Sequence, residues 1–398
     1  MSQDETTQPL HAVEAIANAE QLLSRHFGIT IRLGPGDDLG GSQRSRVYRC
    51  PVLEGPELLA SGVIIKQASE PDGTPLRQAN QLFLNEWASL QFIQALSPAQ
   101  PLAPQFYVGD FNLSMFIMED LGPGEQLNHV LLGRDSARAE AALLNYAGIH
   151  GRLHALSMGR QAEYTAIRAA LGPQEESLYF SFDWLHAQME KIITTLNVQP
   201  ASGIERELHT LQAALTNPGP FLAFIQGDAC PDNIIQTTQG VRMIDFEGGT
   251  YIHALIEGAY GRVPFPTCRC LYRIPENIAL GMEARYRSEL SQSCPAAADD
   301  TLFYHGLIEA TISWALGFHT MVPLEIILPQ DRFIMALTDR QRYLLFFENA
   351  AHLCATHGYM QAIGETLEKL AQKMRLLWPD TEEPPCYPAF QPAPPALP

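Results

Sequence analysis

The chain has 398 residues, of which 46% are hydrophobic and 18% charged, a composition typical of a globular protein large enough for two lobes. Its net charge of −18 argues against a nucleic-acid partner, because binding nucleic acid needs clustered Lys and Arg. No apolar run reaches the length of about twenty residues that a membrane span needs, and the acidic start lacks an apolar signal segment. Seven cysteines, an odd number, suit free thiols in a cytoplasmic protein. The oligomeric state stays open.

The N-terminal part of the chain predicts one helix followed by strands. Apolar residues recur at helical spacing over 10–26, which predicts an amphipathic helix. A Gly-Gly-Ser turn at 40–42 then leads into a strand around Val47, and taken alone it predicts only a hairpin.

A lysine and a glutamate in the next two elements predict an ion pair. Segment 61–67 alternates like a β-strand and ends its apolar run at Lys66, while segment 80–93 has the apolar spacing of a helix with Glu86 on its apolar face. A carboxylate on that face is buried only when it is paired, and Lys66 is the natural partner. Either residue alone is typical of an ordinary surface charge. In this order they predict that Glu86 holds Lys66 against the phosphates of a nucleotide.

The most informative segment begins at Ile225 and has the pattern Gly-Asp-x4-Asn-x11-Asp. Apolar runs on both sides of the turn 237–240 read as the strands of a short hairpin. A magnesium phosphotransferase needs this set of side chains: Asp228 accepts the proton of the attacking hydroxyl, while Asn233 and Asp245 hold Mg²⁺ against the phosphates of ATP or GTP. A lone Gly-Asp-x4-Asn is most often only a turn, but the second half, Ile-Asp-Phe-Glu, favours the catalytic interpretation.

These motifs resemble those of the aminoglycoside phosphotransferase and choline kinase family, usually written His-Gly-Asp-x4-Asn and Ile-Asp-Trp/Phe-Glu, and the resemblance covers most of residues 28–260. It implies an α+β, two-lobed, protein-kinase-like fold with a small antiparallel-sheet N-lobe and a larger, mainly helical C-lobe. We expect a leading helix at 1–27, the nucleotide-binding N-lobe at 28–122, the C-lobe with the catalytic loop and acceptor site at 123–378, and a Pro-rich tail at 379–398. The tail is expected to be either mobile or an extended strap on the surface.

The resemblance also assigns the nucleotide site. It implies that the backbone of Gly41 and the hydroxyl of Ser42 lie over the phosphates. It further implies that adenine hydrogen-bonds to backbone from Met118 through Glu119 to Leu121, where an apolar strand ends. An ordinary hairpin turn and an ordinary buried strand would account for the same residues.

Three residues around the catalytic loop are expected to support it rather than to react. Gln226 stands where the family has His, and its amide can donate and accept hydrogen bonds in a similar way. Glu257 stands where the family usually has an Asp that ties down the loop. His154 ends a helix that resembles the family's Leu-His helix, and we expect it to be structural because Asp228 already supplies the base.

The sequence leaves the acceptor open. Asp183 with Trp184, and Glu309 with Trp314, combine a carboxylate with an aromatic ring as a pocket for an amine-bearing ligand would, although a packed helical core would use the same residues. We expect a kinase that transfers the γ-phosphate to a hydroxyl of a small molecule, for which the acidic chain would suit a cationic acceptor. The alternatives are a metabolic kinase for choline, an amino alcohol or a sugar, and a catalytically silent nucleotide-binding pseudokinase.

Overall fold

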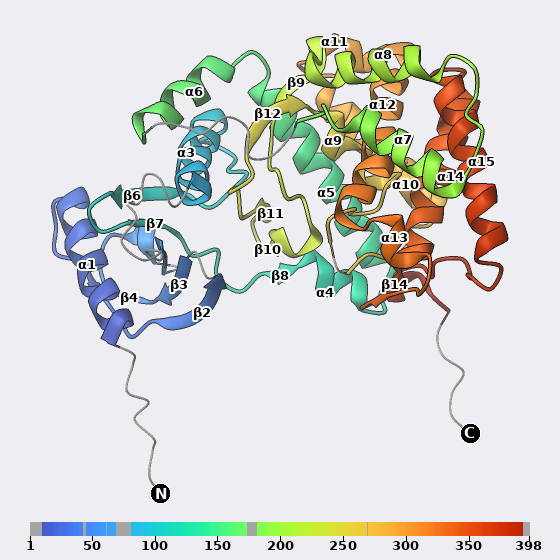
Figure 1. Cartoon of the computed structure of the whole chain (residues 1–398). Helices are drawn as coiled ribbons and strands as arrows, with labels where there is room; N and C mark the ends of the chain where they lie inside the picture. The colour runs from blue at the N-terminus through green and yellow to red at the C-terminus, as the bar shows by residue number, and fades with distance from the viewer. Residues whose placement is uncertain are drawn as a thin grey trace, which may run out of the picture. The chain divides into compact units, whose positions relative to one another are not determined.

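The structure is a computed structural model in which two compact units are distinguished within one chain (Figure 1). Unit 1 comprises Met1–Gly124, Ala162–Glu176 and Thr237–Gly249, and unit 2 comprises Glu125–Gln161, Ser177–Gln236 and Thr250–Pro398. The residues that the structure describes are 10–42, 45–60, 62–68, 81–172, 181–268 and 270–392.

Unit 1 is built on a five-stranded antiparallel sheet in the order β2-β3-β5-β7-β6. Its strands are β2 (Asp37–Ser42), β3 (Ser45–Cys50), β5 (Val63–Ala68), β7 (Met115–Glu119) and β6 (Phe106–Asp110). The strand predicted at 61–67 is the central strand β5, in which Lys66 stands opposite Val47 on one side and Phe116 on the other. Two short strands, β1 (Arg32–Leu33) and β4 (Val52–Glu54), pair separately.

Helices cover the apolar residues of this sheet. The predicted leading helix is α1 (Leu10–Phe27), and its buried positions recur every three or four residues, so that one face packs into the sheet's core. The predicted Glu86 helix is α3 (Gln81–Leu96), most of whose residues are buried. Unit 1 also contains the 3₁₀ turn η1 (Glu57–Leu59), most of α6 (Gln161–Ala170) and the strand β11 (Gly240–Met243).

Unit 2 is mainly helical, and its long helix α12 is apolar on nearly every side, as expected for a central helix. Its helices are α4 (Leu127–Leu132), α5 (Ser136–Ser157), α7 (Leu185–Leu196), α8 (Ile204–Thr216), α9 (Leu255–Gly258), α10 (Glu276–Leu290), α11 (Pro295–Ala298), α12 (Asp300–Met321), α13 (Leu324–Ile327), α14 (Asp339–His357) and α15 (Gln361–Leu377). The short strands are β8 (Glu125–Gln126), β9 (Leu222–Ile225), β10 (Ile234–Thr237), β12 (Thr250–His253), β13 (Phe333–Ile334) and β14 (Leu337–Thr338). The 3₁₀ turns are η2 (Gly219–Phe221), η3 (Pro231–Asn233), η4 (Ala259–Gly261) and η5 (Pro388–Phe390). Strand β9 pairs with β12 and β8 with β10, which fixes both ends of the loop between β9 and β10.

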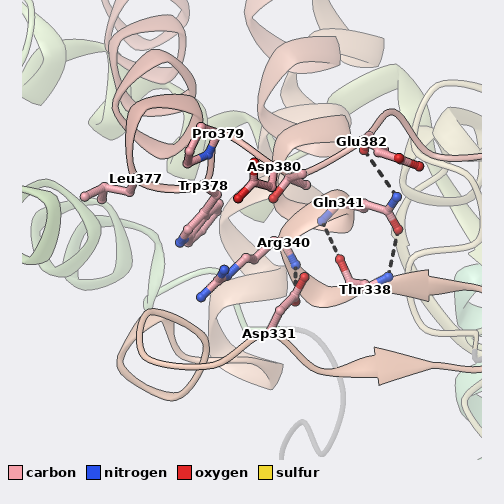
Figure 2. A pocket seen from close by; sticks show the side chains of 10 residues that line it. Asp331, Thr338, Arg340, Gln341, Leu377, Trp378, Pro379, Asp380 and Glu382 are labelled. Atoms are coloured by element: carbon pink, nitrogen blue, oxygen red, sulfur yellow. Dashed lines mark hydrogen bonds between the residues drawn. The ribbon is translucent and has the colours of Figure 1, made fainter.

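The Pro-rich C-terminal segment follows the surface of unit 2 up to residue 392. Cys386 forms a β-bridge with Arg273, and the Tyr387 ring is fully buried. Nearer the start of the segment, the Glu382 carbonyl accepts from the side-chain amide of Gln341, which also forms a capping box with Thr338 at the start of α14 (Figure 2). This part of the tail is therefore an extended strap, while 393–398 lie outside the described residues.

The predicted fold class is confirmed, because a small antiparallel sheet forms unit 1 and a larger helical bundle forms unit 2. Among the described residues no helix combines the length and apolarity needed to cross a bilayer. The expectation of seven free thiols is wrong. Cys230 and Cys268, 38 residues apart, come within 5.8 Å between their Cα atoms and form a disulfide, a proximity that sequence spacing does not reveal.

Candidate functional site

The predicted ion pair is present in unit 1. The Lys66 ammonium on β5 is bonded to the Glu86 carboxylate on α3, and their side chains are only 12% and 3% exposed. Burial alone would lower the pKa of Lys66, but the negative charges of Glu86 and Asp245 outweigh it and raise the pKa above its ordinary value. Lys66 is therefore a buried, fully charged cation beside two carboxylates.

Asp245 is the second carboxylate near this lysine. Its Oδ1 lies 3.9 Å from the Lys66 ammonium, and this atom is buried without a hydrogen-bond partner among the residues that the structure describes. The Asp245 backbone has φ of 60°, a left-handed conformation that costs energy for a residue other than glycine and is concentrated at functional sites. A buried carboxylate oxygen without a donor is a ready ligand for a hard cation such as Mg²⁺.

The helix that carries Glu86 also holds the chain after Asp245. The Asn85 amide donates to the carbonyls of Glu247 (3.0 Å) and Gly249 (2.8 Å). The Tyr164 hydroxyl on α6 in turn reaches both the Asn85 amide oxygen and the Gly249 carbonyl. These bonds join the segment after Asp245 to α3, the helix that carries Glu86.

The glycine-rich turn is tightly packed at Gly41. Its φ is 142°, and a Cβ added there would lie 2.1 Å from the Ser45 carbonyl oxygen, so only glycine fits. The backbone of Ser42 ends β2, but the Ser42 side chain and residues 43–44 lie outside the described part of the chain. The predicted contact of the Ser42 hydroxyl with phosphates is therefore untested.

The predicted adenine site begins at the end of β7. Met118 and Glu119 are still in register with β5, and the Glu119 amide donates to the Gln105 carbonyl. From Asp120 onward the backbone leaves the sheet, and the Asp120 carboxylate is paired with Arg49 (3.1 Å). Leu121 thus follows a well-anchored residue. Binding of adenine there remains a prediction.

The Gly-Asp-x4-Asn motif, which is predicted to be catalytic, forms the loop between β9 and β10 in unit 2. Asp228 is half-buried, and Asn233 at the end of η3 is 9% exposed. The Asn233 amide nitrogen donates to the Asp228 carbonyl (2.9 Å) and to its carboxylate Oδ2 (3.2 Å). Because the side-chain nitrogen of Asn233 donates its hydrogen bonds to Asp228, the side-chain oxygen of Asn233 is the atom that could bind a metal ion.

Three predicted supporting residues hold this loop. The buried Glu257 carboxylate accepts from the backbone amides of Gln226 (3.1 Å) and Gly227 (2.7 Å), and it also contacts His154 Nε2 (3.1 Å). Burial alone would raise the pKa of Glu257, but these hydrogen bonds and the two nearby histidines lower it overall. The Gln226 side-chain oxygen contacts His150 Nε2 (3.1 Å). The hydrogen-bonding contacts expected of Gln226, Glu257 and His154 are therefore present.

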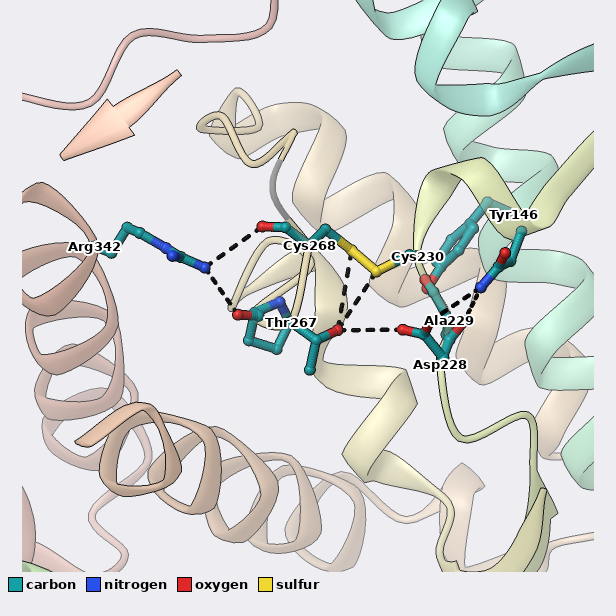
Figure 3. The surroundings of a disulfide bond; sticks show 9 residues. Tyr146, Asp228, Ala229, Cys230, Thr267, Cys268 and Arg342 are labelled. Carbon is teal, nitrogen blue, oxygen red and sulfur yellow. Dashed lines mark hydrogen bonds between the residues drawn. A yellow bond between two sulfur atoms is a disulfide. The ribbon is translucent and has the colours of Figure 1, made fainter. Parts of the chain in front are cut away.

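The sequence did not predict a second set of contacts, made by the residues around Cys268 (Figure 3). The disulfide joins Cys230, two residues after Asp228, to Cys268, and the Thr267 hydroxyl donates to Asp228 Oδ1 at 3.4 Å. Arg342 on α14 donates to the Cys268 carbonyl. The one feature of the sequence that could have indicated these contacts is Cys230, which lies inside the Gly-Asp-x4-Asn motif.

Three of the four acceptor candidates, Asp183, Glu309 and Trp314, make hydrogen bonds within unit 2. Asp183 is exposed and accepts from Gln212 (2.9 Å), and Trp184 precedes α7. Glu309 and Trp314 on α12 are buried: Glu309 accepts from a tyrosine hydroxyl, and the Trp314 indole donates to a backbone carbonyl (2.7 Å). These hydrogen bonds account for the burial of Glu309 and Trp314 in the core of unit 2 without invoking a ligand.

Two cavities in unit 2 lie away from the predicted residues. The first, of about 360 Å³, is lined by the start of α14 and the strap, with the Arg340 guanidinium over the Trp378 ring at 5.2 Å (Figure 2). The second, of about 490 Å³, is lined mostly by α10. None of the residues predicted for the nucleotide, metal or acceptor sites lines either cavity.

A five-stranded antiparallel sheet with a Lys–Glu pair, and a helical unit with an Asp-x4-Asn loop, are the parts of a protein-kinase-like fold. No family model matches the chain, and no curated protein sequence matches it.

Solved structures of small-molecule kinases are similar to the chain. Choline kinase from Streptococcus pneumoniae is 14% identical with a TM-score of 0.43, covering 87% of this chain and 99% of that one. Choline kinase from Cryptosporidium parvum is 13% identical with a TM-score of 0.44, covering 87% and 90%. The ternary complex of streptomycin, ATP and APH(2″)-IIa is 10% identical with a TM-score of 0.45, covering 79% and 94%. At this distance an activity does not transfer from the likeness, and the chain's own residues have to carry it.

Proposed function

We propose that the protein is a small-molecule kinase that transfers the γ-phosphate of ATP or GTP to a hydroxyl group. The observation that carries this proposal is the cluster in unit 1, where a buried, charged Lys66 is held by Glu86 and Asp245 presents a buried oxygen without a hydrogen-bond partner among the described residues. A structural ion pair needs only one carboxylate. A second carboxylate nearby suits a cation and the phosphates that it accompanies.

In this proposal the nucleotide is held mainly by unit 1. Lys66 would bind the phosphates, and Asp245 would hold Mg²⁺. In unit 2, Asn233 offers an amide oxygen of the kind that Mg²⁺ binds. The turn at Gly41 and Ser42 covers the phosphates, and the backbone from Met118 through Glu119 to Leu121 receives the adenine. When bound, Mg²⁺ neutralises charge on the phosphates and so lowers the cost of transferring one of them.

Asp228 is the residue that acts on the acceptor hydroxyl. Its carboxylate takes the proton of the acceptor hydroxyl as the oxygen of that hydroxyl bonds to the γ-phosphorus and the bond to the leaving nucleoside diphosphate breaks. The proton then passes from Asp228 to solvent, which restores the base. The hydrogen bonds from Asn233 orient the carboxylate for this step.

The structure also bears on the pseudokinase alternative. A silent nucleotide binder can lose any residue needed only for chemistry, whereas this chain has Lys66, Asp228, Asn233 and Asp245, with the Lys66–Glu86 pair formed. An active enzyme is therefore favoured. A metabolic kinase for choline, an amino alcohol or a sugar remains the second candidate for the acceptor class, because the same catalytic groups serve each of these hydroxyl compounds.

The test is magnesium-dependent consumption of ATP and GTP in the presence of a panel of amino alcohols, aminoglycosides and sugars. We expect at least one acceptor to stimulate turnover. Asp228→Asn should cut that stimulated turnover by roughly 10²-fold or more, the usual scale for a lost general base, while Mg-nucleotide affinity stays within about twofold of wild type. An Asp228→Asn variant that retains more than a third of the turnover contradicts the assignment of the base. Tight nucleotide binding with no stimulation by any acceptor favours the pseudokinase.

A further inference from the structure

The Asp228 carboxylate is contacted on both of its oxygens by neighbours from different segments. Asn233 donates to Oδ2 from within the same loop, and Thr267 donates to Oδ1 from a segment 39 residues away (Figure 3). At 3.4 Å the Thr267 bond is long for a hydroxyl donor, but hydrogen bonds at active sites are often long before the substrate binds.

The segment that carries Thr267 is fixed covalently to the catalytic loop. Cys268, the next residue, is bonded to Cys230, which lies two residues after Asp228. The Thr267 hydroxyl also lies 3.4 Å from the Cys230 sulfur. One disulfide therefore limits how far Thr267 can move from Asp228.

A buried arginine holds the same segment from the opposite side. The Arg342 guanidinium on α14 donates to the carbonyls of Pro266 (3.1 Å) and Cys268 (3.4 Å), which flank Thr267. Asp339, fully buried in the first turn of α14, lies 3.7 Å from Arg342 and 2.7 Å from Arg332, so its carboxylate is shared by the two guanidiniums. Arg342 thus contacts the backbone on both sides of the exposed Thr267.

The start of the segment is anchored in the core. Phe265 has φ of 42°, a strained conformation for a residue with a side chain, and its ring is fully buried against Tyr146. The Tyr146 hydroxyl donates to the Ala229 carbonyl, next to Asp228 (2.9 Å). Tyr146 therefore contacts both the segment that carries Thr267 and the loop that carries Asp228. The strained backbone of Phe265 lies where the Thr267 segment turns toward that loop.

We infer that Thr267 is a positioning residue for Asp228, whose hydroxyl fixes the carboxylate in the orientation in which it meets the acceptor hydroxyl. An exposed threonine with an incidental hydrogen bond would not need a disulfide, a buried arginine and a strained aromatic anchor around it. Thr267 takes no proton in the reaction. This inference rests on the proposed function, because it takes Asp228 as the general base.

The test compares Thr267→Val, Thr267→Ser and wild type with the disulfide intact. Thr267→Val should lower kcat roughly tenfold, the loss expected for a weak hydrogen bond to a charged group, and leave both KM values within about twofold. Thr267→Ser keeps the hydroxyl and should restore most of kcat. Thr320→Val is the matched control, since the exposed Thr320 hydroxyl donates to the Gly317 carbonyl of its own helix and the variant should behave as wild type. Wild-type kcat in Thr267→Val, or no rescue by serine, overturns the inference.

A second arm separates this inference from the proposed function. In the Asp228→Asn background, Thr267→Val should cost no further turnover, because the two residues act as one unit. The shifts in melting temperature of Thr267→Val and Asp228→Asn should likewise be less than additive in the double variant, a measurement that needs no activity. Additive shifts overturn the contact between Thr267 and Asp228. Non-additive shifts in a protein without acceptor-stimulated turnover would instead support the contact and refute the proposed function.

Discussion

Glu309 provides a direct test of how burial in unit 2 changes the pKa of a carboxyl group. Its carboxyl is 9% exposed, accepts a hydrogen bond from the Tyr359 hydroxyl (2.6 Å) and lies 3.7 Å from His253 Nε2. Burial raises the pKa of Glu309 from 4.5 to about 7, and the Tyr359 bond opposes this only in part. Burial also lowers the pKa of His253 to about 3, so His253 offers no positive charge at neutral pH.

The effect of Glu309 on the free energy of unfolding follows from its pKa of 4.5 in the unfolded chain and about 7 in the folded protein. Between pH 4.5 and pH 7 the folded protein keeps a proton on Glu309 that the unfolded chain has released, so stability is highest below pH 4.5 and falls as pH rises to about 7. The difference, 7 minus 4.5, is about 2.5 and corresponds to about 3 kcal/mol. Glu309→Gln removes the titration, so its free energy of unfolding relative to wild type should rise by about 3 kcal/mol across this window.

The measurement is urea unfolding of both proteins from pH 5 to pH 8. Tryptophan fluorescence is a suitable signal, because Trp314 is buried on the same helix. Glu368→Gln on α15 is the matched control, since Glu368 is exposed and its variant should follow wild type at every pH. If the difference between Glu309→Gln and wild type stays constant within about 0.5 kcal/mol from pH 5 to pH 8, the explanation through burial is refuted.

Two further predictions concern the cluster in unit 1. Asp245→Ala should abolish the magnesium-supported part of nucleotide binding while the melting temperature shows an intact fold; calorimetry with and without Mg²⁺ measures this, and unchanged affinity would exclude Asp245 as a metal ligand. Lys66→Ala should weaken Mg-nucleotide binding and turnover, Glu86→Ala should do so more mildly, and the double variant should cost little more than Lys66→Ala. Full additivity of the two losses in kcat/KM would show that Lys66 and Glu86 act independently.

The parts of the site that the sequence predicted correctly depend on local patterns. Strand alternation placed Lys66 on a strand, and helical spacing placed Glu86 on a buried face, so a single long-range assumption, that a buried carboxylate needs a partner, was enough to pair them. The support of the loop by Glu257 was predicted through family resemblance, although Glu257 lies about 30 residues beyond the amides that it accepts from. In each case a local pattern or a family motif marked the residue.

The contacts that the sequence did not predict join segments far apart in the chain. Nothing in the local pattern around Cys230 distinguishes Cys268 from the other five cysteines as its partner, since cysteine pairing depends on tertiary proximity. Arg342 belongs to a helix 74 residues beyond Cys268 and is recognisable in the sequence only as one of many charges. The acceptor candidates stay predictions for a related reason, because an aromatic residue beside a carboxylate is equally typical of a packed helix such as the one that carries Glu309 and Trp314.

In the function proposed above, these long-range contacts hold the loop that carries the base, Asp228. A catalytic base on a loop is mobile unless the neighbouring residues are held, and here successive residues are held by different elements. Glu257 binds the amides before Asp228, Tyr146 binds the carbonyl after it, and Cys230 is covalently bonded. Closing a 38-residue loop with a disulfide stabilises the fold by about 4 kcal/mol, but mainly by restricting the unfolded chain. The contacts that reach the Asp228 carboxylate itself are the hydrogen bonds from Asn233 and Thr267, and the proposed positioning role of Thr267 rests on the second of them.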